Sequence, residues 1–386
     1  MRTPIALLTA AVLVSAGVVA AMRIRAGRSS PTVRTFYIAA DETVWDYAPS
    51  GRNLTTSQEF NEIEKRLMVA GPLVIGRKAR KAIYREYTDS SFSTPKERPA
   101  EWEHLGMLGP LVRGVVGDTI RVVFRNNASF PASVHPHGVF YDKDSEGAPY
   151  DDGTSGADKA DDGVPTGGTH VYTWVVPERA GPSEMEGSSI LWMYHSHVDE
   201  TRDVASGLIG PMIITRDGMA DADGAPRDVD REIVAGFIEV DENHSWYVER
   251  NVREFATQPD SVEIGPFGIG GGMVAGEKAD DYFRETINGY SFGHTPGMTM
   301  RVGQKVRWYV MASTNFEFHS PHWHGNVVVA NHMRTDVGTL LPMGMFVADM
   351  APDNPGRWFL HCHVSDHLRM GMQAFFTVEP ATTVAN

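Results

Sequence analysis

Ten of the fifteen histidines and the only cysteine occur in two similar arrangements, one in each half of the chain. The second half contains His319-Ser-Pro-His322-Trp-His324, then His361-Cys362-His363-Val-Ser-Asp-His367, and then Met372. The first half contains His135-Pro-His137 and His195-Ser196-His197. Alignment of the halves pairs His135 with His322, His137 with His324, His195 with His361 and His197 with His363. His-x-His pairs repeated at matching spacing indicate that both halves bind metal.

Four other positions differ between the halves. The second half has His319, Cys362, His367 and Met372 where the first half has Ala132, Ser196, Thr201 and Ser206. Two histidines, a cysteine and a weak methionine ligand are typical of a mononuclear, electron-transferring copper site. The sequence therefore predicts such a site in the second half only, and one part of a shared histidine site in each half.

Strand geometry explains how one segment could serve both sites. Successive side chains of a strand point to opposite faces, so Cys362 would face into its own domain while His361 and His363 face outward. Eight outward imidazoles, four from each half, can hold three coppers, which makes four coppers per chain with the mononuclear one. Zinc competes for histidine sites, but it favours four ligands and does not explain this many. Because an isolated His-x-His pair is usually structural, the prediction depends on the repeat.

The composition indicates an all-β protein with two domains. A chain of 386 residues can form two full cores, and its 38 glycines and 23 prolines separate short runs rich in Val, Ile, Tyr and Trp. We predict two Greek-key β-sandwiches in tandem, at residues 34–217 and 231–380, joined by the polar segment Asp217–Asp230. The predicted strands are Thr119–Phe124, Val171–Val176, Ile190–His197, Val306–Met311, Val327–Ala330, Trp358–His363 and Ala374–Val378.

The first residues predict export. Arg2 precedes an apolar run from Pro4 to Ala21, and Val19-Ala20-Ala21 is a plausible cleavage site, so residues 1–33 are interpreted as an export signal and linker. An uncleaved membrane anchor is the alternative. A single cysteine cannot form a disulfide within the chain, which reserves the thiol of an exported protein for another use. The net charge of −14 favours cationic reductants, and we expect no nucleic-acid partner.

The sequence resembles the multicopper oxidases, and within them the ceruloplasmin-like branch with two cupredoxin domains. Besides the histidine motifs, the resemblance includes Ala40–Gly51, His104–Pro110, Val139–Gly147, Gly207–Met212 and Ile287–Gly289. It implies that four one-electron donors are oxidised while dioxygen is reduced to two waters. It also implies type 2 copper at His135 and His322, and type 3 copper at His137, His195, His197, His324, His361 and His363. Type 1 copper would be bound by His319, Cys362 and His367, with Met372 axial.

Ferroxidases of this branch hold ferrous ion beside the type 1 site with carboxylates and a histidine. The matching positions here are Asp280, Glu285 and Asp366, with Glu285 replacing the histidine. Carboxylates are suitable hard ligands for a metal ion. The alternative is that Asp280 and Glu285 belong to an ordinary solvated acidic run, with Glu277–Asp281 as its centre.

The resemblance also implies a calcium loop at Lys143, Asp158, Asp161 and Asp162. Oxygen ligands close in sequence suit a hard divalent cation, whereas the alternative is a charge-rich solvated insertion. Tyr141 matches a tyrosine near the copper cluster of two-domain laccases, where it could supply an electron, although an aromatic beside such a loop could equally serve packing.

Three classes of function follow from these residues. We expect a dioxygen-reducing multicopper oxidase, ferroxidase-like or alternatively a laccase-like oxidase of phenols and amines. A copper nitrite reductase keeps its mononuclear site in the first unit, which Ala132 and Ser196 exclude here. An electron carrier would need only the His319, Cys362, His367 and Met372 set. Because each half contributes four imidazoles, we predict a homotrimer whose clusters lie between chains, with an intrachain cluster as the alternative.

Overall fold

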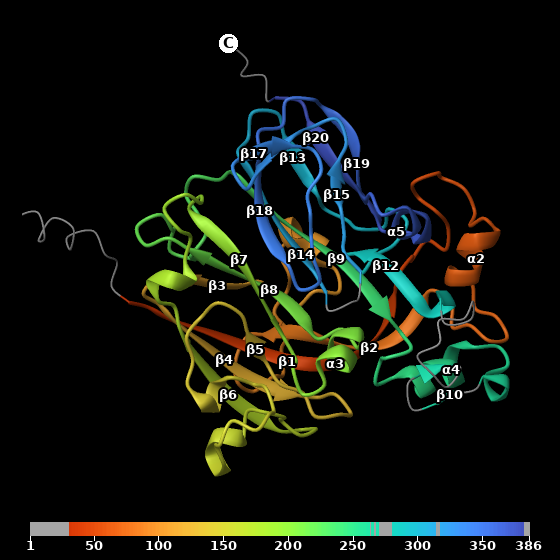
Figure 1. Cartoon of the computed structure of the whole chain (residues 1–386), viewed down its shortest axis with the longest axis horizontal. Helices are drawn as coiled ribbons and strands as arrows, with labels where there is room; N and C mark the ends of the chain where they lie inside the picture. Colours follow the sequence, from red (N-terminus) through yellow and green to blue (C-terminus); the bar gives the residue numbers. More distant parts are fainter. Residues whose placement is uncertain (1–30, 263, 266–267, 270–279, 314–316, 382–386) are drawn as a thin grey trace, which may run out of the picture.

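The computed structural model describes residues 31–381 except residues 263, 266–267, 270–279 and 314–316. Strands dominate this part of the chain, and they form two packed β-sandwiches, one from strands up to Thr215 and one from strands that begin at Arg231 (Figure 1). The prediction of an all-β, two-sandwich fold is confirmed. The export segment before residue 31 lies outside the described residues.

The first sandwich has two four-stranded sheets with orders β2-β1-β4-β6 and β3-β8-β7-β5. Parallel pairings of β1 with β4 and of β3 with β8 require crossovers between the sheets, as expected for a Greek key. The strands are β1 (Val33–Asp46), β2 (Lys78–Tyr87), β3 (Val112–Val115), β4 (Thr119–Asn126), β5 (His135–Pro136), β6 (Thr169–Val175), β7 (Ser189–His195) and β8 (Ile209–Thr215).

The second sandwich repeats this plan, with orders β12-β9-β14-β18-β16-β17 and β13-β20-β19-β15. Its parallel pairings of β9 with β14 and of β13 with β20 correspond to those of the first sandwich. A separate pair joins β10 (Ile264–Gly265) to β11 (Gly268–Ile269). The other strands are β9 (Arg231–Asp241), β12 (Phe283–Ile287), β13 (Thr299–Arg301), β14 (Val306–Ala312), β15 (Pro321–Trp323), β16 (Val328–Ala330), β17 (Met333–Thr335), β18 (Met345–Met350), β19 (Gly356–Cys362) and β20 (Gln373–Glu379).

Four α-helices, none longer than eight residues, connect the strands of the described chain. They are α2 (Glu62–Met68), α3 (Glu200–Ala205), α4 (Val248–Phe255) and α5 (Ser365–Met370). Helices α3 and α5 occupy equivalent places, because each follows the strand that carries a His-x-His motif. Among the described residues, no helix is long and apolar enough to cross a membrane.

The two sandwiches pack against each other through a shared apolar core. Leu191 and Met193 of β7 belong to the same buried cluster as Val234, Tyr309 and Met311 of the second sandwich. Each sandwich also has a core of its own. Polar contacts cross the same boundary, among them the bidentate pair of Arg113 with Glu232 and the hydrogen bond between the hydroxyls of Ser189 and Tyr309. This packing fixes the positions of the metal-ligating strands in both domains.

Candidate metal centres

The predicted mononuclear set lies together at the end of β19. Cys362 Sγ lies 3.9 Å from His319 Nδ1 and 3.6 Å from His367 Nδ1, and these two nitrogens are 3.1 Å apart. Met372 is fully buried in the same core, and its backbone N–H donates to the carbonyl of His367. A thiol and two imidazole nitrogens thus converge inside the second sandwich.

The protein surroundings of this set suit a bound metal ion. Burial lowers the pKa of His319 to about 3, so its imidazole stays neutral and free to ligate. Burial also raises the pKa of the Cys362 thiol, and a bound cation would stabilise the thiolate against this cost. Backbone N–H groups of Ser320 and Val364 donate to Sγ at 3.3 and 3.4 Å and orient it.

The four histidines of the first sandwich form one group on β5 and β7. His135 pairs directly with His195 across these strands. The Nε2 atoms of His137 and His195 are 3.1 Å apart, and the ring centroid of His197 lies 5.1 Å from that of His135. Burial lowers the pKa of His137 to about 4 and that of His195 well below its usual value, which keeps both rings neutral.

The four histidines of the second sandwich repeat this arrangement on β15 and β19. His322 pairs with His361 in the same antiparallel register. The Nε2 atoms of His324 and His361 are 3.0 Å apart, and the ring of His363 stacks on that of His322 at 4.6 Å. The buried Nδ1 of His322 has no hydrogen-bond partner among the described residues, and coordination to a metal ion would satisfy its lone pair.

Hydrogen bonds fix the orientation of several rings in both groups. Nδ1–H of His135 donates to the carbonyl of Glu146 at 2.6 Å, and Nδ1–H of His361 donates to the carbonyl of Cys362 at 2.8 Å. These bonds leave Nε2 as the free ligating atom, the usual second-sphere arrangement for metal-binding histidines. Tyr141 lies beside the first group, with its ring 6.0 Å from that of His135.

The two histidine groups remain separate within one chain. In the described residues, every ring contact between these histidines joins members of the same sandwich. The possible ligand sets also divide in this way, with His135, His137 and His195 in one and His322, His324 and His361 in the other. The two groups are therefore separate in the described chain, and each is called a half-site.

A buried acidic group borders the mononuclear set. Glu285 on β12 lies directly opposite Glu239 on β9, and each approaches the ring of His367, at 4.0 and 3.9 Å. Burial, followed by the neighbouring carboxylates, raises the pKa of Glu239 to about 8 and that of Glu285 well above its usual range. Within the described part of the chain, the buried Oε2 of Glu285 has no hydrogen-bond partner. Facing carboxylates with an unpaired oxygen fit a cation, which would relieve their repulsion.

Sequence reasoning missed two members of this group, Glu239 and Glu317. Glu317 accepts a hydrogen bond from His367 Nε2 at 2.9 Å and is 59% exposed, so it connects the mononuclear set to solvent. Glu239 could have been noticed in the sequence because it is the only charged residue in the otherwise apolar segment Ile233–Val240. Asp366 is exposed on α5 and does not belong to the Glu239, Glu285 and His367 set. The side chain of Asp280 lies outside the described residues.

The four residues of the predicted calcium loop do not form one metal-ligating group in the described chain. The Nζ atoms of Lys143 and Lys159 instead lie 3.2 and 2.8 Å from the carboxylate of Asp152, and Lys159 also pairs with Asp162. Asp158 is exposed. The buried Asp161 accepts the backbone N–H of Gly147 at 2.7 Å, next to the carbonyl of Glu146 that holds His135. Asp161 therefore supports the loop that orients the His135 ring.

Two family models, both described as multicopper oxidase, match residues 102–218 and 272–382. Together they cover more than half of the chain and include all ten motif histidines. The chain belongs to the multicopper oxidase family. Solved structures agree on the fold: a multicopper oxidase superposes with a TM-score of 0.55 at 17% identity, covering 91% of this chain and 92% of that one. The blue copper oxidase from Nitrosomonas europaea gives 0.55 at 18%, covering 90% and 86%.

The chain is similar in sequence to three animal proteins. It is 41% identical to human ferroxidase HEPHL1, 39% identical to mouse hephaestin and 37% identical to human ceruloplasmin. These matches cover 92%, 90% and 89% of the chain but 30%, 29% and 31% of the relatives. The chain thus spans about a third of their length.

Proposed function

We propose that this protein is an oxidase that takes electrons singly from a small reductant and uses them to reduce dioxygen to water. The observation that carries the proposal is the pairing of a buried Cys362–His319–His367 set with two open groups of four histidines. Copper at these positions supplies one-electron transfer at the first set and oxygen reduction at the second. The enzyme would hold four coppers per chain.

Each residue has a definite part in this proposal. Type 1 copper is assigned to His319, Cys362 and His367 with Met372 axial, and type 2 copper to His135 and His322. Type 3 copper is assigned to His137, His195, His197, His324, His361 and His363. Cys362 is the covalent neighbour of His361 and His363, so the chain itself provides a short route between the two kinds of site.

Replacement of the thiol tests this assignment. Cys362→Ser should abolish the blue absorbance and retain three of the four coppers, because His361 and His363 do not depend on the thiolate for their place beside β15. Metal analysis and visible absorbance of the fully loaded protein give the answer. Wild-type protein that holds only one or two coppers, or a Cys362→Ser variant that stays blue, would refute the assignment.

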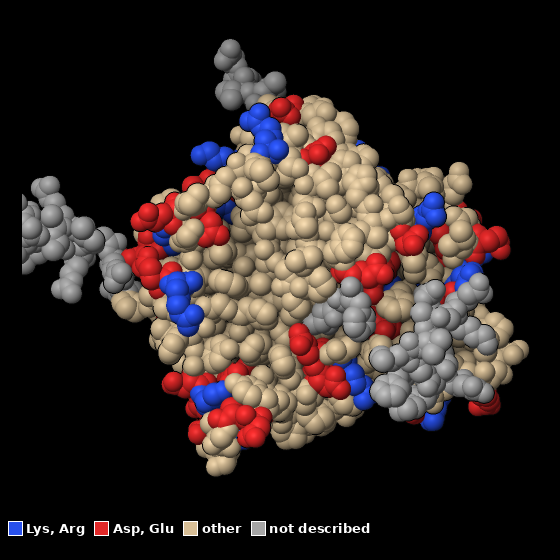
Figure 2. Space-filling model, viewed as in Figure 1, with Lys and Arg blue, Asp and Glu red and all other residues tan. Residues whose placement is uncertain are grey.

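We also propose a homotrimer whose three-copper clusters lie between chains. The separation of the two histidine groups within one chain supports this, because each half-site then needs the other kind of half-site from a neighbour. Figure 2 shows a broad uncharged area over the centre of one face, with charged side chains toward its edge. A surface depleted of charge is typical of the core of an interface. Head-to-tail pairing of unlike faces closes into a ring when the rotation permits.

For the electron donor, we infer a small cation, ferrous ion in particular. The acidic group of Glu239, Glu285 and Glu317 supports this, since it lies against His367 and opens to solvent at Glu317. The similarity to human ferroxidase HEPHL1 agrees with this inference. Glu317 would receive the cation, and its hydrogen bond to His367 Nε2 would place the donor one imidazole ring away from the type 1 site.

Steady-state oxygen consumption with ferrous ion and with a phenol tests the donor. Glu317→Gln should raise KM for ferrous ion about tenfold or more, on the scale of a lost second-sphere or metal ligand, and change KM for the phenol little. Glu249→Gln is the matched control, because it removes the same charge from the exposed surface of α4. The same two KM values for Asp366→Ala show how much this exposed aspartate contributes to the use of ferrous ion. If Glu317→Gln changed KM equally for both donors, or if the wild type oxidised the phenol faster than ferrous ion, the enzyme would be a laccase.

We further infer that the protein is exported. The support is the Arg2 and Pro4–Ala21 pattern with its small-residue cleavage site. N-terminal sequencing of the protein purified from its native host would reveal whether the segment is removed.

A further inference from the structure

The first sandwich has a buried polar network where the second has its type 1 site. Ser196 stands in the place of Cys362, and its Oγ accepts the backbone N–H of Ser133 at 3.0 Å, just as Cys362 Sγ accepts that of Ser320 at 3.3 Å. Ser196 then donates to Asp203 Oδ2 at 2.6 Å. Both Ser196 and Asp203 are completely buried.

Asp203 also takes over the second acceptor role of the thiolate. In the second sandwich, the N–H of Val364 donates to Cys362 Sγ at 3.4 Å. In the first, the equivalent N–H of Val198 donates to Asp203 Oδ2 at 2.9 Å, and the N–H of Asp199 donates to the same oxygen at 3.2 Å. The serine hydroxyl and the carboxylate together therefore reproduce the hydrogen-bond acceptors that the cysteine sulfur offers alone.

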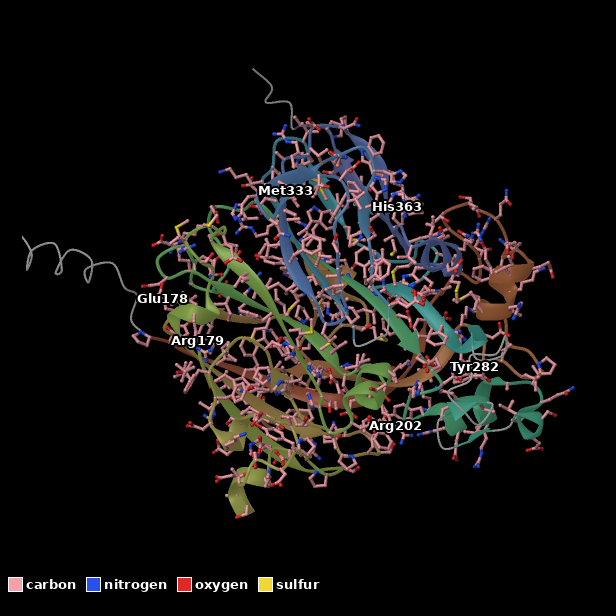
Figure 3. The ribbon with its side chains drawn as sticks, in the orientation of Figure 1. Glu178, Arg179, Arg202, Tyr282, Met333 and His363 are labelled. Carbon is pink, nitrogen blue, oxygen red and sulfur yellow. The ribbon has the colours of Figure 1, made fainter. Side chains whose placement is uncertain are left out.

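A tryptophan from the other domain completes the network. Trp246, which follows β9, donates its indole N–H to Asp203 Oδ1 at 2.8 Å, and its backbone N–H donates to Ser206 Oγ at 3.0 Å. Ser206 stands in the place of Met372. The indole is held between the guanidinium of Arg202 at 3.8 Å and the ring of Phe130 at 5.3 Å. Arg202 is labelled in Figure 3. A segment of the second domain thus contacts both Asp203 and Ser206, the residue in the place of Met372.

We propose that Asp203 and Trp246 are positioning residues for the copper-binding His195 and His197, doing in the first domain what the type 1 ligand shell does in the second. This rests on the proposed function, because it takes both histidines to be cluster ligands. They flank Ser196 in sequence, and the backbone of His197 is held by Ser133 Oγ at 3.0 Å. Groups behind metal-bound histidines typically change metal affinity or activity 10- to 100-fold when they are removed.

The test measures cluster copper and type 1 copper separately in the full-length, copper-loaded protein under graded chelator competition. Total copper minus the copper that gives the blue absorbance reports the cluster. Asp203→Ala and Ser196→Ala should release cluster copper at a chelator concentration about 10-fold or more below that needed for the wild type. The blue absorbance should be retained. Glu249→Gln is the control, because it removes a carboxylate from the exposed surface of α4, where Glu249 pairs with Arg253, and it should leave both kinds of copper unchanged.

A conservative pair of variants distinguishes positioning from a general packing defect. In Asp203→Asn, the amide oxygen can still accept from Ser196 and Val198. The amide NH₂ group, however, faces the indole N–H of Trp246, and two donors cannot form a hydrogen bond with each other. Trp246→Phe removes that donor, so the double variant should hold cluster copper more tightly than Asp203→Asn alone. This comparison tests the positioning role even if Asp203→Ala does not fold.

Three results would overturn the proposal. The first is cluster copper retained as in the wild type by Asp203→Ala or Asp203→Asn. The second is loss of type 1 and cluster copper in equal proportion, and the third is a double variant no better than Asp203→Asn. A wild-type protein without cluster copper would refute the proposed function as well, whereas normal wild-type loading with unaffected variants would refute the positioning role alone.

Discussion

His104 should make the joint between the two domains sensitive to acid. Its side chain is completely buried, and its Nε2 accepts the backbone N–H of Val234, the fourth residue of β9, at 3.1 Å. An imidazolium cannot accept a hydrogen bond, so protonation would break this contact between the domains. Burial, followed by the nearby charge of Arg231, lowers the pKa of His104 from 6.5 to about 3.

Acid therefore destabilises the folded protein through His104. Because the folded protein binds this proton less readily than the unfolded chain does, His104 contributes stability that is complete above pH 6.5. That stability is lost as the pH falls toward about 3. The pKa difference between the unfolded and folded protein corresponds to about 5 kcal/mol of stability, at roughly 1.4 kcal/mol per pKa unit. About 2 to 3 kcal/mol of this stability is lost by pH 4.5. This is a large part of the stability of an ordinary domain.

Urea unfolding of wild type and His104→Gln, at pH 7.5 and pH 4.5, measures the effect. The glutamine oxygen can accept from Val234 at both pH values, so the variant should lose about 2 to 3 kcal/mol less than the wild type between them. His244→Gln is a control of opposite sign, because the hydrogen bond to Asp241 raises the pKa of His244 and its stabilisation is greatest in acid. Equal pH dependence in wild type and His104→Gln would refute the reasoning.

Two further predictions concern the histidine half-sites. A mixture of His135→Ala/His137→Ala chains with His322→Ala/His324→Ala chains should recover oxygen consumption, because some interfaces then receive two intact half-sites. No recovery, or a monomer with four coppers that turns over oxygen, would refute the trimer. Gly138→Ala should lower the free energy of unfolding by about 1–3 kcal/mol and weaken cluster copper binding. Gly138 has φ +77°, and an added Cβ would lie 2.2 Å from the Trp192 ring; wild-type stability and copper affinity would contradict this.

The strands and the histidine groups could be predicted because their signals are local. The predicted strand Trp358–His363 is observed as β19, Gly356–Cys362, and Ile190–His197 as β7, Ser189–His195. In both cases the last histidine of the motif lies just beyond the strand, where the chain turns toward a short helix. These helices, α3 and α5, have six residues each and are too short to show an apolar period.

The acidic group beside His367 could be predicted only in part, because strand register creates it. Glu239 and Glu285 lie 46 positions apart and face each other because β9 pairs with β12 in one particular register. A shift by one residue would turn each side chain to the other face of the sheet. The Asp203–Trp246 contact is likewise a product of tertiary structure, since it joins residues of different domains.

The asymmetry between the halves also limits how chains can assemble. Only the second half-site is joined through His361 and His363 to a cysteine, so a cluster made of two first half-sites would have no such connection to an electron entry site. Twofold pairing of like faces would produce that isolated cluster, along with another joined to two cysteines. Head-to-tail pairing gives every cluster one half-site of each kind, and therefore one neighbouring Cys362. Among clusters formed between chains, only this second arrangement gives each cluster one type 1 site, and this argument supports the closed ring proposed above.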